Sequence, residues 1–387
     1  MTSQTRLQRP GWLTDEVLRG MRWGLVLTWI GVFAAQCVLH GIPYFRSDLL
    51  VWLATLLLAC TFGRRAMFYV LVDFVPLATV LVGYDYLRNL ADTMGMPTWW
   101  HPQLDVDRFL FFGNVPSVWL QAHLRHVDVR WYDVLVSLCY FSFFLAPYVT
   151  AAALWLRRRA EFYRWSLRFV ALSFLGFGFF ALIPSAPPWA AALCSSADVA
   201  QHPNSPPCLT YGDPASGGLL GRMQHNRPGT HPWIDRISTR GFDDLHLRFA
   251  GSVIRAGQGG VDLIAAVPSL HIGGTTLLAL FLWSRVRARW RPLLVAYVLV
   301  MAFSLVYSGE HYVSDCLAGA LLAVLVHVAG LRIERRLAAR RTPRVDADTL
   351  GTQQHRPADQ QEQQCPPTRQ NATPPSAPPH AMTPSST

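Results

Sequence analysis

Long apolar runs without charged residues recur along most of the chain, and short polar or basic segments separate them. A helix needs about 20 mostly apolar residues to cross the hydrocarbon core of a membrane. Most runs approach that length, so they predict about eight transmembrane helices. The expected helices lie at about 23–39, 49–62, 67–87, 132–156, 167–183, 270–283, 294–307 and 312–331. The pattern therefore predicts an all-α, polytopic membrane protein.

The segments outside these runs divide the chain into parts. Residues 89–131 are rich in Trp and Phe but too interrupted to span a membrane, so we expect them to lie in the headgroup region. Residues 185–267 form the longest region that does not span. The predicted parts are a polar N-terminal tail, two N-terminal transmembrane helices, a main membrane domain and a disordered tail rich in Gln, Pro, Ser and Thr, at 1–22, 23–65, 66–335 and 340–387.

Arginine alone carries the basic charge, because the sequence has a net charge of +10 and no lysine. The arginines gather at the ends of apolar runs, which favours a role in membrane orientation and argues against nucleic-acid binding. The N-terminal tail, the turn at Arg64, the triplet that begins at Arg157, the loop around Arg287 and the C-terminal segment would share the cytoplasmic side. Both termini are then cytoplasmic, and 89–131 and 185–267 face outward. Arginine in place of lysine is typical of a GC-rich genome, so we expect a bacterial plasma membrane.

Two of the seven cysteines, Cys194 and Cys208, lie in the same polar loop and flank a run that contains three prolines. A disulfide between them is chemically permitted if the loop faces an oxidising exterior. The alternative is a pair of free surface thiols, and the spacing alone does not decide between the two. The pair is therefore a disulfide candidate.

Two histidines and one aspartate lie at the tips of apolar segments near the C-terminal end of the membrane region. His311 and Asp315 are four residues apart at the start of one predicted helix, so they share a face. A carboxylate that accepts from one imidazole nitrogen leaves the other nitrogen free to attack. His271 lies at the start of the predicted helix 270–283, and two membrane-length segments separate it from His311. If one segment crosses the membrane and the next crosses back, His271 and His311 lie at the same membrane surface. This predicts a phosphoryl-transfer site for lipids; the alternative for His311 and Asp315 is helix capping or interfacial anchoring.

The segment around His271 reads VPSLHIGG. A proline at its start places Ser269 and His271 in the first helical turn, where free backbone N–H groups suit a phosphate. Gly273 would let a neighbouring helix or a ligand come close. Ser269 and Gly273 are therefore predicted to lie in the binding site.

The motifs Ser269-Leu270-His271 and His311-x-x-x-Asp315 resemble the second and third signature motifs of the type 2 phosphatidic acid phosphatase superfamily. The form HYVSD is most similar to the branch of inositol phosphorylceramide and sphingomyelin synthases, and IPSAPPW and DRFLFFGNVPSVWLQ look like actinobacterial members. The resemblance covers about residues 70–330 and implies a six-helix catalytic core without a metal or other cofactor. It also implies that His311 is the nucleophile, that Asp315 orients it and that His271 protonates the leaving group.

The sequence departs from the phosphatase pattern at the residues that clamp the phosphate. Where that pattern has Ser-Arg before the nucleophile, this chain has Ser304-Leu305, and the lysine-containing first motif is absent. The synthase branch lacks the same elements, so the sequence leans towards it. Arg88 is the predicted replacement clamp, with a simple interfacial anchor as its alternative; Arg222, Arg227 and Arg255 are further candidates. Tyr312, next to His311, completes the predicted substrate-binding set.

Several functions remain open at this stage. The acceptor is either water, which makes a lipid phosphatase, or an alcohol such as inositol, which makes a synthase. A proton-coupled transporter would use buried ionisable groups near mid-membrane, and only Asp73 fits that pattern. A metal-dependent hydrolase would instead use His311 and Asp315 as ligands. The expected partners are a membrane lipid, a polyol acceptor and the bilayer itself.

Overall fold

The computed structural model describes residues 14–40, 46–64, 66–91, 95–204, 206–245 and 265–341. The chain divides into a unit of Met1–Glu334 and a unit of Arg335–Thr387, and the fold below is that of the first unit. Parts of the predicted regions lie outside the described residues: 1–13 of the N-terminal tail, 41–45 and 65 of the two-helix region, 92–94 of the segment 89–131, 205 and 246–264 of the long loop, and 342–387 of the C-terminal tail.

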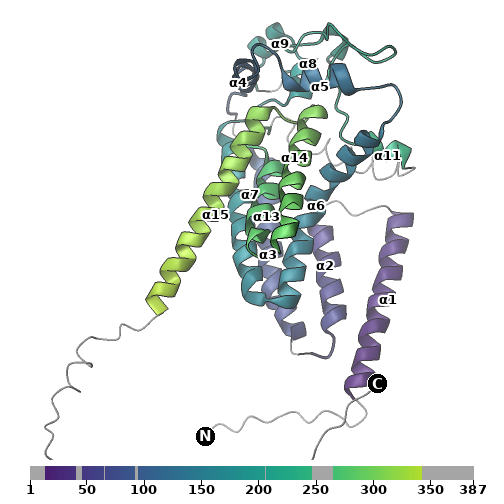
Figure 1. Cartoon of the computed structure of the whole chain (residues 1–387), viewed down its shortest axis with the longest axis vertical. Helices are drawn as coiled ribbons and strands as arrows, with labels where there is room; N and C mark the ends of the chain where they lie inside the picture. The colour runs from purple at the N-terminus through teal and green to yellow at the C-terminus, as the bar shows by residue number, and fades with distance from the viewer. Residues whose placement is uncertain are drawn as a thin grey trace, which may run out of the picture. The chain divides into compact units, whose positions relative to one another are not determined.

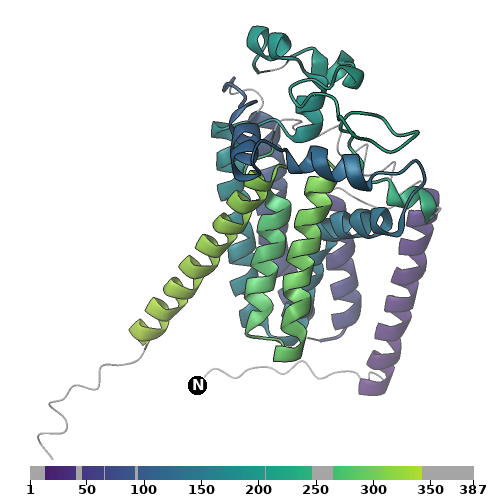
Figure 2. The same ribbon diagram turned by 45° about the horizontal axis from the view of Figure 1, so that its top comes forward.

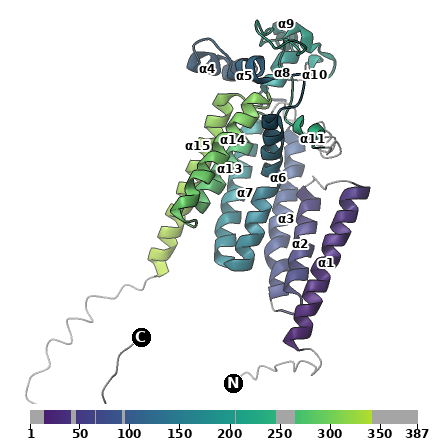
Figure 3. The ribbon, with the colours of Figure 1, turned by 45° about the vertical axis from the view of Figure 1, so that its right-hand side comes forward.

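The apolar runs fold into long helices that pack beside one another in a bundle (Figures 1 and 3). Of the described helices, five are long and apolar enough to cross a membrane, and shorter apolar stretches occur in three more. The five are α1 (Asp15–Leu39), α6 (Trp131–Arg157), α7 (Arg159–Leu182), α14 (Arg291–Tyr307) with the turn before it, and α15 (Val313–Arg341). The three are α2 (Arg46–Thr61), α3 (Ala66–Ala91) and α13 (Leu270–Trp283). The chain is thus a helical integral membrane protein, while the number of eight crossings stays a prediction.

Short helices form a second layer over one end of the bundle, which we call the cap layer (Figures 1 and 2). It comes from the two regions predicted not to span, 89–131 and 185–267. Several of its helices begin with a proline at the first position, where a missing N–H costs nothing. Its helices are α4 (Pro102–Leu110), α5 (Pro116–Leu124), α8 (Pro188–Leu193), α9 (Ser196–Gln201), α10 (Cys208–Tyr211), η2 (Pro214–Ser216) and α11 (Gly241–Asp244).

Three distant stretches of chain meet where the cap layer joins the bundle. Isolated parallel bridges pair Trp99 with Ser185 and Ser185 with Ala265. The Trp99 N–H donates to the carbonyl oxygen of Pro184, and the Ala266 N–H donates to that of Ser185. These bonds bring the entry to α4, the exit from α7 and the entry to α13 to one point, and they account for the described β pairing.

The core between α6, α7 and α13 is built on large side chains. Trp165 and Phe281 are almost fully buried, and their rings pack edge to face at 5.3 Å. The indole N–H of Trp165 donates to the carbonyl oxygen of Pro147 at 3.0 Å. Helices in lipid are held together by close packing and by hydrogen bonds of this kind, because lipid tails are as apolar as the side chains. The packed core therefore fixes where α13 stands.

Asp73, the one residue that fits an ionisable group near mid-membrane, has hydrogen-bond partners on both carboxylate oxygens. Its carboxylate accepts from Nε and Nη2 of Arg159 at 2.5 and 2.6 Å, and from the indole N–H of Trp155 at 2.7 Å. Tyr163 donates to the same carboxylate. A buried carboxylate with this many partners ties α3 to α6 and α7, which is a structural role.

Cys194 and Cys208 form a disulfide within the cap layer. It closes the segment that contains α9, and the two cysteines pack with Trp100 and Val199 in a small separate core. The indole N–H of Trp100 donates to the carbonyl oxygen of Pro203 inside the closed segment at 2.8 Å. The proline-rich run is therefore fixed both by the disulfide and by a contact to the entry of α4.

A thiol count tests this disulfide. The sequence has seven cysteines, and one disulfide leaves seven minus two, or five, free thiols. Protein purified without reductant and unfolded in denaturant should therefore titrate five thiols, and seven after reduction. Seven thiols before reduction would rule the disulfide out, and they would also remove one argument for placing this layer outside the cell.

Candidate active site

Three helix ends meet at the end of the bundle beneath the cap layer. α13 and α14 run antiparallel and are joined through η3 (Ala288–Trp290), so α13 starts where α14 ends (Figure 2). α15 begins a few residues after α14. The backbone N–H of Ser269, just before α13, donates to the backbone carbonyl oxygen of Asp315 in α15 at 3.0 Å. The first turns of α13 and α15 are therefore in direct contact.

This contact brings the three predicted catalytic residues together. The ring centroids of His271 and His311 are 5.6 Å apart. Nδ1 of His311 lies 3.5 Å from Oδ2 of Asp315, whose side chain is fully buried. That separation exceeds a normal hydrogen bond but is close enough for an ion pair. Asp315 thus faces the Nδ1 side of the His311 ring and leaves the Nε2 side directed elsewhere.

Two carboxylates cap the start of α15. Oδ2 of Asp315 accepts from the Tyr312 N–H, while Asp107 in α4 accepts from the N–H groups of Val313 and Ser314, all at 2.9 Å. Burial raises the pKa of Asp107, and its hydrogen bonds from Ser314 and Val313 oppose that shift. Helix capping, the alternative considered for Asp315, is therefore realised together with its contact to His311. Asp107 is the first residue of the segment DRFLFFGNVPSVWLQ, although no role was predicted for it, and it holds α4 against the helix that carries His311.

Glycines allow α13 and α15 to approach this closely. A Cβ on Gly319 would lie 2.1 Å from the carbonyl oxygen of Ser269, far inside van der Waals contact. A Cβ on Gly273 would lie 3.3 Å from the carbonyl oxygen of Gly319. Gly273 was predicted to admit a helix or a ligand, and its neighbour here is a helix. Both glycines set the distance between His271 and His311.

The other predicted binding residues are placed as follows. Ser269 is fully buried, and its hydroxyl caps α13 by accepting from the Ile272 N–H at 3.5 Å. Tyr312 is fully buried and packs with Leu104 and Val115 of the cap layer. Arg88 belongs to α3, but its side chain lies outside what the structure describes. Ser269 and Tyr312 therefore contact protein groups: Ser269 caps α13, and Tyr312 packs against the cap layer.

The remaining candidate arginines do not form a described clamp. Arg227 donates from Nε to the carbonyl oxygen of His123 at 2.9 Å. Arg222 is exposed in the loop after η2, and Arg255 lies outside the described residues. None of them has a described contact with His271 or His311.

An ion pair that sequence reasoning missed lies next to His311. Arg236 donates from Nε and Nη2 to the two carboxylate oxygens of Glu310, both at 2.9 Å, and Ser238 donates to the same carboxylate at 2.6 Å. The guanidinium carbon lies 4.9 Å from the ring centroid of Trp189. Burial alone would lower the pKa of Arg236, but the neighbouring Glu310 carboxylate outweighs it and raises that pKa above its ordinary value.

Tyr140 connects this pair to the second histidine. Its hydroxyl is hydrogen-bonded to Arg236, and its ring stacks on that of His271 with centroids 4.9 Å apart. Arg236 is therefore one side chain away from His271, while its partner Glu310 directly precedes His311. Arg236 is one of six arginines in residues 185–267. No local pattern distinguishes it from the others, because its contacts form only in the fold.

The segment that carries Arg236 is held by its backbone on both sides. The amide nitrogen of Gln121 in α5 donates to the carbonyl oxygens of Asp235 and Tyr307, both at 2.8 Å, and its oxygen accepts from the Asp235 N–H at 3.1 Å. The Ile237 N–H donates to the carbonyl oxygen of Ser308 at 3.2 Å. The position of Arg236 therefore depends on the cap layer as well as on Glu310.

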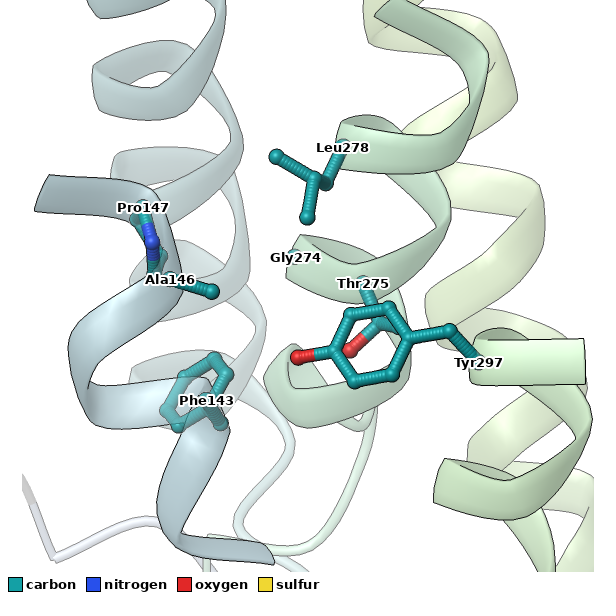
Figure 4. A pocket seen from close by; sticks show the side chains of 7 residues that line it. All are labelled: Phe143, Ala146, Pro147, Gly274, Thr275, Leu278 and Tyr297. Atoms are coloured by element: carbon teal, nitrogen blue, oxygen red, sulfur yellow. The ribbon is translucent and has the colours of Figure 1, made fainter. Parts of the chain in front are cut away.

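A small cavity lies between α6, α13 and α14, one turn beyond His271 (Figure 4). The ring of Phe143 separates the two, with its centroid 4.2 Å from that of His271. Thr275 and Tyr297 contribute the hydroxyls, and that of Tyr297 pairs with Ser142 at 2.7 Å. The lining residues are Phe143, Ala146, Pro147, Gly274, Thr275, Leu278 and Tyr297. The catalytic candidates thus lie at the capped end of the bundle, with apolar packing beneath them.

Comparison with known proteins identifies the family. The family model described as the PAP2 superfamily matches residues 103–329, more than half of the chain. The chain belongs to the PAP2 superfamily. Membership implies phosphatase or phosphotransferase activity on phosphate esters. No curated protein and no solved structure matches the chain. The matched region runs from α4 to α15, so it contains both histidines, the Asp107 cap and the Arg236–Glu310 pair.

Metal ligands are a separate question for this site. Within the part of the chain that the structure describes, no group of three or more His, Cys, Asp or Glu side chains is arranged to hold a metal ion.

The glycine contact gives a test of the site geometry. Gly319→Ala should force α13 and α15 apart, since overpacking of this kind costs about 1–3 kcal/mol and moves His271 away from His311. We expect a lower unfolding temperature in detergent and reduced hydrolysis of phosphate esters. Gly178→Ala in α7 is the matched control, because a Cβ there meets nothing within 4 Å. A Gly319→Ala protein as stable and as active as the control would contradict the assigned contact.

Proposed function

We propose that the protein is a membrane-lipid phosphotransferase or phosphatase that acts through a phosphohistidine on His311. The observation that carries this proposal is the pairing of His311 and His271 from two different helices, 5.6 Å apart, with the buried Asp315 behind His311. A nucleophile, a residue that orients it and a facing acid–base group are the parts that covalent catalysis requires. PAP2 membership supports chemistry on a phosphate ester.

The geometry supports the roles that the family resemblance implies. Asp315 would hold the proton on Nδ1 of His311, so that the lone pair on Nε2 attacks the phosphorus. The bond from phosphorus to the lipid oxygen breaks, and His271 donates a proton to that oxygen. In the second step His271 takes a proton from water or an alcohol, whose oxygen attacks the phosphohistidine and releases His311. The reaction then ends with both histidines in their starting states.

A lipid substrate in the outer leaflet is supported by where the site lies. The histidines are at the ends of apolar helices, beneath the cap layer. The opposite end carries the exposed Arg157, Arg158 and Arg287, and Arg285 there bonds to Glu161 at 2.8 Å. Basic residues favour the cytoplasmic side, so the histidines would face the exterior. A disulfide in the cap layer fits an oxidising compartment.

Two observations favour an alcohol such as inositol over water as the acceptor. Leu305, which stands where the phosphatase pattern has its clamping arginine, is fully buried in the core with Met301. A phosphate-binding cation must therefore come from another element. This agrees with the synthase-like branch that the HYVSD motif resembles, so we propose transfer to an alcohol as the main reaction and hydrolysis as its alternative.

The rivals from other classes find less support. A proton-coupled transporter would need a titrating group within the bundle, but Asp73 is bound by Arg159 and Trp155. A metal-dependent hydrolase using His311 and Asp315 would lose activity on treatment with a chelator. The phosphohistidine route predicts activity that survives the chelator.

Substitution of the histidines tests the proposed roles. Purified full-length protein is assayed against phosphatidylinositol, phosphatidic acid and polyprenyl phosphate, with and without free inositol. His311→Ala should lower turnover by about a thousandfold or more, because a nucleophile has no substitute. His271→Ala should affect lipid substrates strongly and nitrophenyl esters weakly, since a good leaving group needs no acid.

The exposed His123 in α5 provides the control, because its ring bonds only within its own helix in the described contacts. His123→Ala should keep wild-type turnover. Retention of about a tenth or more of wild-type activity by His311→Ala would rule the mechanism out.

Cysteine labelling tests which side the site faces. Tyr211 in α10 is 86% exposed, and Arg287 lies in the exposed loop between α13 and α14. A membrane-impermeant maleimide should label Tyr211→Cys in intact cells, and Arg287→Cys only after permeabilisation, relative to the unsubstituted protein. The reverse order would place the histidines on the cytoplasmic side.

A further inference from the structure

The ring of His271 lies against three aromatic side chains of α6. They are Tyr140, Phe143 and Phe144, and their ring centroids are 4.9, 4.2 and 6.0 Å from that of His271. Tyr140 is stacked on the imidazole with 25° between the ring planes, whereas Phe144 meets it at 83°. The spacing i, i+3 and i+4 places all three on one face of α6. The orientation of His271 is therefore constrained by a single helix face.

Tyr140 differs from the two phenylalanines in having a hydroxyl group. A buried tyrosine usually has a hydrogen-bond partner for that group, and Tyr140 is only 3% exposed. Its hydroxyl is hydrogen-bonded to the guanidinium of Arg236, in the segment that crosses from the cap layer. A single side chain of α6 therefore contacts both the proposed proton donor His271 and the cap layer.

Arg236 is itself held in one orientation. Its Nε and Nη2 donate to the two carboxylate oxygens of Glu310, both at 2.9 Å, and its guanidinium carbon lies 4.9 Å from the ring centroid of Trp189. Two parallel N–H···O bonds fix the plane of a guanidinium as well as its position. The hydroxyl of Tyr140 therefore has a hydrogen-bond partner with a fixed position.

These contacts form a path of side chains between the two histidines. Glu310 directly precedes His311, and its carboxylate holds Arg236. Arg236 holds the Tyr140 hydroxyl, and the Tyr140 ring stacks on His271. The contact between α13 and α15 fixes the two backbones, but a histidine with a fixed backbone can still turn about χ1 and χ2. The path acts on those side-chain angles.

We propose that Tyr140 is a positioning residue for His271: its ring and its bond to Arg236 hold the imidazole in the orientation that protonates the leaving group. This inference rests on the proposed function and adds a residue to it. In the step concerned, a P–N bond forms to His311 and the bond from phosphorus to the lipid oxygen breaks. The proton of His271 passes to that oxygen, so His271 is left neutral. Tyr140 neither gains nor loses a proton.

The experiment compares two esters that differ in their leaving group. One is the lipid that the wild type turns over fastest among the three assayed above, and the other is the nitrophenyl ester of the same phosphoryl group. The measured quantity is kcat/KM, because it covers only the steps up to release of the first alcohol, in which His271 acts as an acid.

Tyr140→Phe keeps the ring and loses the hydroxyl, whereas Tyr140→Leu loses both. For the lipid, kcat/KM should fall about fivefold in Tyr140→Phe and about fiftyfold in Tyr140→Leu, because a misplaced acid gives only part of its catalytic effect. For the nitrophenyl ester, both variants should stay within about twofold of wild type, since a good leaving group needs no acid.

Matched controls remove the same groups elsewhere. Tyr297→Phe removes a hydroxyl that pairs with Ser142, and Phe141→Leu removes a ring of α6 that packs on Phe242. Both should keep wild-type kcat/KM for the two esters.

A double variant tests whether Tyr140 acts through His271. In the His271→Ala background, Tyr140→Leu should change lipid kcat/KM by less than about twofold, because no imidazole is left to position. A purely structural role would instead add its own loss.

The outcomes distinguish this inference from the proposed function. Lipid kcat/KM within about twofold of wild type in Tyr140→Phe, equal losses for both esters in a folded Tyr140→Leu protein, or a further loss in the His271→Ala background would overturn the positioning role and leave His311 as nucleophile. Full activity of His311→Ala would overturn the proposed function instead. If Tyr140→Leu does not fold, Tyr140→Phe decides alone.

A structural comparison decides the inference if neither ester is turned over. The cryo-EM structures of the wild type and Tyr140→Leu are then compared at His271. A ring that turns in the variant supports the inference, and a ring with unchanged χ1 and χ2 overturns it.

Discussion

The contact between the first turns of α13 and α15 is the constraint on which the site depends. The hydrogen bond from the Ser269 N–H to the Asp315 carbonyl oxygen forms only because Gly319 has no side chain. Each helix carries one histidine at its tip, so the helix spacing sets the distance between the two rings. Within lipid, close backbone approach and hydrogen bonding are the forces that hold such a crossing. The packing of α13 against α15 in the bundle therefore sets the distance between the His271 and His311 rings.

The cap layer contributes charge and position. Asp107 closes the free N–H groups at the start of α15, which fixes the helix that carries His311. Gln121 holds the backbone beside Arg236, and the disulfide pins the segment around α9. Buried polar groups of this kind are fully partnered and therefore rigid. The bundle supplies the nucleophile and its orienting carboxylate, while the cap layer supplies the arginine that balances Glu310.

Features encoded by nearby residues could be predicted from the sequence. The long helices follow from the apolar runs, and the facing histidines follow from an antiparallel path between two such runs. The family follows from two short motifs. The Cys194–Cys208 disulfide was one of two alternatives that the spacing left open, and the structure has the bonded form.

Arg236, Glu310, Asp107 and Gln121 could not be assigned in the same way. Arg236 is separated by 74 residues from Glu310, and Asp107 by 206 from Val313, so no periodicity or motif links them. Their roles depend on how the cap layer folds over the bundle. The prediction of Arg88 as the clamp stays untested, because its side chain lies outside the described residues. The sequence pattern also did not predict where the short helices of the cap layer begin and end, including those that begin with proline.

The most direct test of the account is to trap the covalent intermediate. Protein is mixed with a lipid substrate labelled with ³²P, quenched in alkali, where phosphohistidine is stable, and digested for mass spectrometry. The account predicts label on the peptide that contains His311, formed within one turnover and absent from His311→Ala. Label on another residue, or continued turnover with no labelled protein, would contradict it.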